Sequence, residues 1–246
     1  MILHLPNLLT TGELQQLRHW LTVDAANDAV HGWSDGRMTA GSQSRQTKNN
    51  QQLPETSPIA QQASMLVSEA FARNPLFVTG ALPKRVYPPL FNRYAGAANS
   101  FGSHIDNAVR TEARTARHLR TDISCTLFLS DPSTYEGGEL VVSDTFGDHA
   151  IKLAAGDAVL YPGTSVHHVN PVTKGERLAS FFWIESMVRR DDQRRLLYDM
   201  DMAILSLRQK HAQKNIDQKN KAQPDSEEIV RLTGCYHNLL RMWCDV

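Results

Sequence analysis

The stretch that decides the fold is residues 123–162, ISCTLFLSDPSTYEGGELVVSDTFGDHAIKLAAGDAVLYP. Its short apolar runs alternate with turn-forming groups, which are Asp131–Pro132, Glu136–Gly137–Gly138 and Phe146–Gly147–Asp148. Many short strands separated by turns are typical of an antiparallel sandwich or barrel. Strands are therefore expected over ISCTLFLS (123–130), GGELVVSD (137–144) and HAIKLAAGDAVLYP (149–162). The pattern continues outward and predicts further strands over KRVYPPLFNRY (84–94), SFGSHID (100–106), SVHHVNPV (165–172) and RLASFFWIES (177–186).

Helical patterns flank this β-region. Thr10 and Glu13 have the spacing of a capping box, and apolar residues at helical intervals predict a helix from about residue 12 to residue 21. Ser57 followed by Pro58 is typical of a second helix start. Beyond Met187 the apolar residues again return at helical spacing, with one polar linker between two helices. The ends of the chain are therefore expected to be rich in helix.

These patterns divide the chain into three regions and predict an α+β protein with a mainly β core. Residues 1–75 form an N-terminal helix and strand region that supports the core. Residues 76–187 form the β core itself, and residues 188–246 form a helical C-terminal extension. Within the first region, residues 31–52 are rich in Gly, Ser, Thr, Asn and Gln, and predict loops or edge strands.

Composition excludes several classes of protein. The 26 Lys and Arg residues equal the 26 Asp and Glu residues, which argues against a dedicated nucleic-acid binder because such proteins usually carry a basic excess. The three cysteines lie far apart, so a disulfide framework or thiolate zinc site is not expected. No signal peptide and no run long enough to span a bilayer are recognised. The expected location is the cytoplasm, without membrane or nucleic-acid partners.

One pair of residues suggests chemistry. His104 and Asp106 are separated by one residue, and side chains at positions i and i+2 of a strand share a face. Ile105 is then expected to turn into the opposite layer. An imidazole beside a carboxylate supplies two ligands of the 2-His-1-carboxylate triad that suits non-haem Fe(II). The pair alone is equally typical of a hydrogen-bonded surface pair, so a third ligand decides its meaning.

The third ligand is expected on a later strand. His167 and His168 are both candidates, and only one of them can face the interior because neighbours on a strand alternate. Arg177 opens the next strand, and its planar guanidinium could pair with both oxygens of an organic carboxylate. Without the histidines, Arg177 would be interpreted as a solvated charge at a strand end.

The residues at this point resemble a known family. The segments FNRYAGAANSFGSHIDNAVR, SCTLFLSDPSTYEGGELVVSD, VLYPGTSVHHVNPVTKGERLASFFWIES and VRLTGCYHNLLRMW together resemble the bacterial PKHD-type hydroxylases. These enzymes are Fe(II)- and 2-oxoglutarate-dependent dioxygenases related to prolyl and lysyl hydroxylases. The resemblance runs from Met1 to Val246 and includes the helical tail, which 2-oxoglutarate enzymes in general lack. It implies a double-stranded β-helix, or jelly roll, for the β core, with N-terminal helices packed on it.

The resemblance also implies site residues. His104 and Asp106 match the family's His-x-Asp ligands, and His167 matches its distal histidine, with His168 as the alternative. Arg177 follows His167 at the family's spacing and is implied to bind 2-oxoglutarate. Tyr94 matches a tyrosine beside the co-substrate, although a packed core tyrosine is an equally good interpretation.

The activity implied by the resemblance is hydroxylation of an unidentified substrate with Fe(II), 2-oxoglutarate and dioxygen. The 2-oxoglutarate is decarboxylated to succinate and CO2, and ascorbate is implied as a reductant. The substrate is expected to be a peptidyl side chain or a small molecule such as a siderophore. Asn107, Arg110 and Trp183 are candidates for the rim and wall of the pocket, or alternatively solvated and core residues.

Two other functions compete with this hypothesis. A cupin-like jelly-roll module would hold a structural metal or none, and the fold alone does not separate it from an enzyme. A sensor would bind Fe(II) and 2-oxoglutarate and act on a partner through its C-terminal helices. Those apolar helices could also pack on another subunit and form a homo-oligomer. Arg177 at a fixed distance from a third histidine favours the enzyme, because a plain binding module does not need it.

Overall fold

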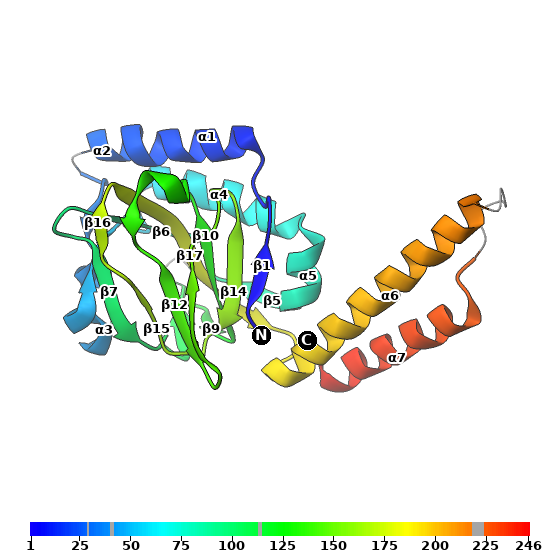
Figure 1. Ribbon diagram of the computed structural model, residues 1–246. Helices are drawn as coiled ribbons and strands as arrows, with labels where there is room; N and C mark the ends of the chain where they lie inside the picture. The colour runs from blue at the N-terminus through cyan, green and yellow to red at the C-terminus, as the bar shows by residue number, and fades with distance from the viewer. Residues whose placement is uncertain (29, 40–41, 113–114, 218–223) are drawn as a thin grey trace.

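The computed structural model describes the whole chain apart from residues 29, 40–41, 113–114 and 218–223. Two antiparallel sheets pack against each other at the centre of the molecule (Figure 1). The larger sheet has eight strands in the order β1-β14-β10-β17-β6-β4-β2, with β5 paired to β17. The smaller sheet has five strands in the order β13-β12-β15-β7-β3. The expected fold class, a mainly β core with flanking helices, is confirmed.

The strands are short, as the sequence predicts. Those of the larger sheet are β1 (Leu3–Leu5), β14 (Ala158–Pro162), β10 (Ile123–Phe128), β17 (Glu176–Ser186), β6 (Leu90–Ala95), β4 (Gln51–Gln52), β2 (Ser34–Asp35) and β5 (Pro83–Val86). Those of the smaller sheet are β13 (Gly147–Ile151), β12 (Leu140–Asp144), β15 (His167–Val169), β7 (Ser100–His104) and β3 (Lys48–Asn49). Two further pairs are β11 (Glu136–Gly137) with β16 (Val172–Lys174), and β8 (Val109–Thr111) with β9 (His118–Arg120).

Strand β14 shows how alternating side chains divide the core into two layers. Ala158 and Leu160 pack with the helices on one face of the larger sheet. Val159 and Tyr161 point to the other face and pack with residues of the smaller sheet. Both faces of the larger sheet are therefore covered, which explains why all six residues of β10 are buried, although two of them, Ser124 and Thr126, are polar and line a cavity.

Helices cover the outer face of the larger sheet (Figure 1). The main ones are α1 (Thr11–His19), α4 (Pro58–Ala72) and α5 (Pro75–Ala81), with the short segments η1 (Trp20–Asp24) and α2 (Ala25–Asn27) after α1. The other short helices lie elsewhere: α3 (Ser42–Thr47) and η2 (Gly36–Thr39) pack beside β7 and β3 of the smaller sheet, and η3 (Pro132–Thr134) follows β10. The predicted capping box is confirmed, because Thr10 and Glu13 exchange side-chain to backbone hydrogen bonds. Ser57 caps α4 by accepting from the backbone of Ala60.

Two stretches that were each predicted as one strand are divided. Residues 149–162 contribute to β13 and β14, which lie in different sheets, and Gly156 between them has a φ of +95° that a glycine adopts without strain. Residues 84–94 contribute to β5 and β6, and the break contains Pro88 and Pro89, which have no N–H to donate to a ladder.

The C-terminal helices α6 (Asp191–Asp217) and α7 (Glu227–Trp243) lie side by side and extend away from the sheets (Figure 1). Near their base, Leu197 and Tyr236 belong to a small apolar cluster with Leu82 from the end of α5. The backbone N–H of Asp245 donates to the carbonyl of Met187, so the end of α7 returns to the start of α6. None of the described helices is long and apolar enough to cross a membrane.

Candidate metal centre

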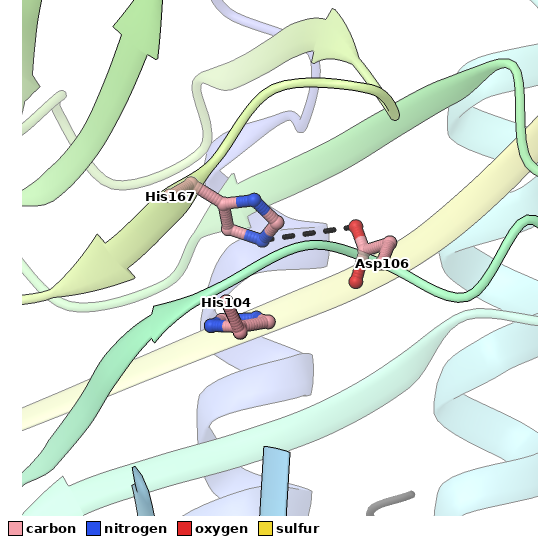
Figure 2. A group of neighbouring side chains, drawn as sticks. All are labelled: His104, Asp106 and His167. Atoms are coloured by element: carbon pink, nitrogen blue, oxygen red, sulfur yellow. Dashed lines mark ion pairs between the residues drawn. The ribbon is translucent and has the colours of Figure 1, made fainter. Parts of the chain in front are cut away.

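Three side chains from two segments that are distant in sequence meet at the smaller sheet. His104 ends β7, Asp106 follows two residues later, and His167 begins the neighbouring strand β15 directly opposite His104. One potential ligand atom from each residue lies within 4.8 Å of the others (Figure 2). The Nε2 of His167 is 3.7 Å from Oδ2 of Asp106, and the two imidazole centroids are 4.3 Å apart. Two imidazoles and one carboxylate converging on one point form the donor set of a facial metal triad.

Backbone carbonyls orient both histidine rings. The Nδ1 of His104 lies 2.8 Å from the carbonyl oxygen of Gly102, and the Nδ1 of His167 lies 3.0 Å from that of Ser165. A carbonyl can only accept, so each Nδ1 carries a proton, and Nε2 is the nitrogen of each ring that is available to a metal. Burial, reinforced by the neighbouring His167, lowers the pKa of His104 to about 4. The ring is therefore neutral at pH 7, which is the form that binds metal.

The carboxylate is oriented as well. The hydroxyl of Ser124, on β10 of the larger sheet, donates to Oδ2 of Asp106 at 2.6 Å. This hydrogen bond crosses from one sheet to the other and fixes the rotation of the carboxylate. Ser124 was not recognised from the sequence, because its distance along the chain from Asp106 gives no local pattern.

His168 lies outside the cluster. It is half-buried, and its Nε2 is 3.2 Å from Oδ1 of Asn170. The alternation of neighbours on β15 therefore brings His167 to Asp106 and turns His168 away. The expectation for Ile105 is wrong, because its side chain is 43% exposed rather than packed in the opposite layer. Strand β7 ends at His104, so the alternation of a strand does not extend to Ile105.

Arg177 is a buried cation between the sheets. It lies on β17 directly opposite Tyr94 of the neighbouring strand β6, and only 1% of its surface is exposed. Its guanidinium carbon lies 5.2 Å from the ring centre of Tyr94 and 5.3 Å from that of Phe128. Among the residues that the structure describes, its Nε and Nη1 have no hydrogen-bond partner. The interpretation as a solvated strand-end charge is therefore wrong. A buried guanidinium with two unpaired nitrogens is costly, and a carboxylate is the anion that its fork matches best.

Tyr94 is completely buried beside Arg177. Burial raises the pKa of Tyr94, so its hydroxyl stays protonated at neutral pH and can donate a hydrogen bond. The amide of Asn92 donates to this hydroxyl at 3.4 Å, which leaves the phenolic proton free to reach another acceptor.

The triad and Arg177 line one cavity. Asn107, Arg110 and Trp183, which were candidates for its rim and wall, do line it. The sequence did not reveal several other wall residues, which are Lys48, Phe101, Ser124, Tyr161 and Phe181. Lys48 lies in the segment predicted as loop or edge strand, and nothing in that polar composition indicates a buried lysine.

The chain was compared with known proteins. The model of the 2OG-Fe(II) oxygenase superfamily matches residues 89–185, and that of the PKHD-type hydroxylase C-terminal domain matches residues 191–218 and 213–245. A PKHD-type hydroxylase of Polaromonas sp. is 52% identical over 245 residues, covering 100% of both chains. The chain belongs to the PKHD-type hydroxylase family. Another member, from Xanthomonas campestris pv. campestris, is 53% identical over 248 residues and also covers 100% of both chains.

Solved structures agree with the fold of this family. A Trichoplax adhaerens prolyl hydroxylase, in complex with a hypoxia inducible factor peptide fragment, has a TM-score of 0.56 at 15% identity, covering 80% of this chain and 86% of its own. The epimerase SnoN from nogalamycin biosynthesis has a TM-score of 0.53 at 16% identity, covering 76% of this chain and 78% of its own. The jelly-roll expectation is thus confirmed. Family membership makes the chain a 2-oxoglutarate-dependent dioxygenase, which rules out a module without catalytic activity.

Proposed function

We propose that His104, Asp106 and His167 hold the Fe(II), and that Arg177 and Tyr94 bind 2-oxoglutarate beside it. The observation that carries the proposal is Arg177, a fully buried guanidinium with unpaired nitrogens in the same cavity as the triad. Two imidazoles and one carboxylate suit Fe(II), and a guanidinium with two unpaired nitrogens suits a dicarboxylate. The residues present therefore fit both groups.

The bound iron supplies the oxygen chemistry, in which 2-oxoglutarate is decarboxylated to succinate and CO2 while a substrate C–H bond is hydroxylated. The protein supplies orientation. Gly102, Ser165 and Ser124 fix the three ligands through the hydrogen bonds described above. The buried guanidinium of Arg177 would donate hydrogen bonds to a carboxylate, and the buried hydroxyl of Tyr94 has a proton to donate to the same group.

The substrate is either a peptidyl side chain or a small molecule such as a siderophore. The Trichoplax adhaerens structure contains a prolyl hydroxylase with a peptide, and SnoN acts in the synthesis of a small molecule. The shared fold thus serves both kinds of substrate. A cytoplasmic location, ascorbate as reductant and assembly through α6 and α7 stay predictions.

The test of the proposal is formation of succinate from 2-oxoglutarate under Fe(II). Wild-type protein should produce succinate, and His104→Ala should produce it at a rate near the protein-free background. His168→Ala is the matched control, because His168 lies outside the cluster, and it should keep most of the wild-type rate. Equal rates for wild type and His104→Ala would sink the assignment of the iron site.

A further inference from the structure

A second buried cation lies in the cavity. Lys48, on β3, is 6% exposed and lines the same cavity as the triad. Its ammonium group donates to the Thr39 hydroxyl at 3.0 Å and to the side-chain oxygen of Gln52 at 2.8 Å. Over the described ranges of the chain, no carboxylate lies within ion-pair distance of it, and the nearby Asp35 is paired with Arg37. Burial of an ammonium without a counter-ion destabilises a fold, so its presence calls for a functional explanation.

Arg110 provides a third cation at the same cavity. Its guanidinium carbon lies 4.4 Å from the ring centre of Trp183, and that ring is 5.7 Å from the ring of Phe181. The ammonium of Lys48 in turn lies 5.9 Å from the Phe181 centre. Like Lys48, Arg110 forms no ion pair with any residue in the described part of the chain. Two cations are therefore held around one pair of aromatic rings.

The two cations repel each other. Burial lowers the pKa of Lys48 to about 8, and the positive charge of Arg110 adds to this effect. Lys48 is still largely protonated at pH 7. The arrangement is therefore unfavourable in the ligand-free protein, and an anion bound near the two cations would relieve it.

The proposed cofactors do not supply this anion. The positive charges of Fe(II) and Arg177 are together matched by the negative charges of Asp106 and a 2-oxoglutarate dianion. In the metal-free protein the negative charge of Asp106 attracts Lys48. A bound metal ion neutralises that charge, so Asp106 no longer compensates Lys48. Lys48 and Arg110 are left without a counter-ion. Dioxygen is uncharged, so of the reactants the primary substrate is the one that could supply it.

We propose that Lys48 and Arg110 form a binding site for a carboxylate carried by the primary substrate on an apolar or aromatic skeleton. The aromatic walls, Phe101, Phe181 and Trp183, line the cavity beside the two cations and provide the apolar contacts. This inference rests on the proposed function, because it assigns 2-oxoglutarate to Arg177. It narrows the substrate to molecules whose reacting carbon is linked to an acidic group.

The test is direct binding to the full chain loaded with Ni(II) in place of Fe(II) and saturated with 2-oxoglutarate. The probes are benzoate and benzamide, which have the same ring and differ in charge. Saturation with 2-oxoglutarate occupies the site at Arg177, so calorimetric titration with benzoate measures a different site. Wild-type protein should bind benzoate and should bind benzamide at least about tenfold more weakly, because the amide lacks the charge that strengthens both hydrogen bonds.

Substitutions of Lys48 and Arg110 test whether these two cations bind the benzoate. Lys48→Met and Arg110→Met should each weaken benzoate binding at least about tenfold. Lys210→Met removes an exposed lysine on α6 and should bind benzoate as the wild type does. Retention of 2-oxoglutarate binding shows that a variant is folded, and if one of the pair does not fold, the other decides.

Three results would overturn the inference: no benzoate binding by the loaded wild type, equal binding of benzoate and benzamide, or unchanged benzoate binding in a folded Lys48→Met or Arg110→Met protein. Failure of the wild type to bind 2-oxoglutarate in the presence of Ni(II) would instead contradict the proposed function. The two failures are therefore separated by the first step of the same titration.

Discussion

Arg177 and Lys48 are both buried cations in one cavity, yet their surroundings differ. Arg177 is almost completely enclosed between aromatic rings, and two of its nitrogens have no partner in the described structure. The ammonium of Lys48 donates hydrogen bonds to Thr39 and Gln52, which compensate part of the cost of its burial. The other cation near it, Arg110, is only half-buried. A rigid planar group without partners suits one ligand of fixed shape. The flexible ammonium of Lys48, which has only neutral partners, suits ligands that vary in shape.

The difference suits the two ligands proposed for this cavity. Arg177 is held in register by β17 and β6, inside the larger sheet, so its position depends on the core. Lys48 is held by the short strand β3 at the edge of the smaller sheet, where it pairs with Phe101 on β7. The co-substrate common to the family is thus assigned to the core, and the substrate of this enzyme to the edge.

The largest expected effect falls on the triad on which both ligands depend. Changes to residues that merely orient metal ligands cost about 10–100-fold, so loss of a ligand should cost more than about 100-fold in succinate formation. We expect this for His167→Ala, whereas His168→Ala should change the rate less than about threefold. The measurement is the initial rate under Fe(II). A similar loss in both variants would mean that the strand alternation does not select the ligand.

The next effect distinguishes the two cations. Arg177→Met should weaken 2-oxoglutarate binding by about 100-fold, because a carboxylate loses a buried charged partner. Arg177→Lys keeps the charge but loses the planar fork, so it should recover only part of the affinity. Lys48→Met should bind 2-oxoglutarate within about threefold of the wild type. Titration calorimetry with Ni(II) measures all three. If Lys48→Met were as impaired as Arg177→Met, the division between core and edge would fail.

A smaller effect is expected from the hydrogen bond between the sheets. Ser124→Ala removes the hydroxyl that fixes Asp106 and should lower metal affinity by about tenfold. Ser143→Ala is a matched control, since its hydroxyl bonds to exposed Asp148 on β13, away from the cavity. Competition between the protein and a metal-sensitive dye measures the affinity. Equal affinities in the two variants would show that Ser124 does not act through Asp106.

The smallest expected effect is a gain in stability, whereas the substitutions above cause losses of activity or affinity. Lys48→Met removes an ammonium that burial disfavours, so it should raise the unfolding free energy of the ligand-free protein by about 1–2 kcal/mol at pH 7. The pKa of Lys48 is about 8 in the folded protein against a normal value of 10.5. Between these values the unfolded chain binds more protons, so the contribution of Lys48 to stability should rise with pH across this window.

Denaturant unfolding of wild type and Lys48→Met at several pH values measures this contribution as a difference. The advantage of the variant should shrink as the pH rises from 8 toward 10.5. A variant that is less stable than the wild type at pH 7 would show that Lys48 supports the fold rather than a ligand.

Much of the fold could be predicted from local patterns. The capping box of Thr10 and Glu13 and the short apolar runs of the core depend on neighbouring residues, and they appear in the structure as predicted. The predictions that failed required knowledge of distant partners. Residues 149–162 divide between two sheets, and Ile105 leaves its strand, because pairing with other strands determines where a strand ends.

The sequence by itself determined three features: the His-x-Asp spacing of His104 and Asp106, the family, and the place of Arg177 at the start of a strand. All three are patterns of residue identity and spacing along the chain. The tertiary structure alone decided two further features: the burial of Arg177 with two nitrogens unpaired among the described residues, and the position of Lys48 in the same cavity. It also brings His167, the histidine that the resemblance favours, to Asp106 and leaves His168 outside the cluster. The physical reason is that burial and charge pairing depend on segments brought together by the sheets. Strand β3, far from the histidines along the chain, places a lysine beside them only when it pairs with β7.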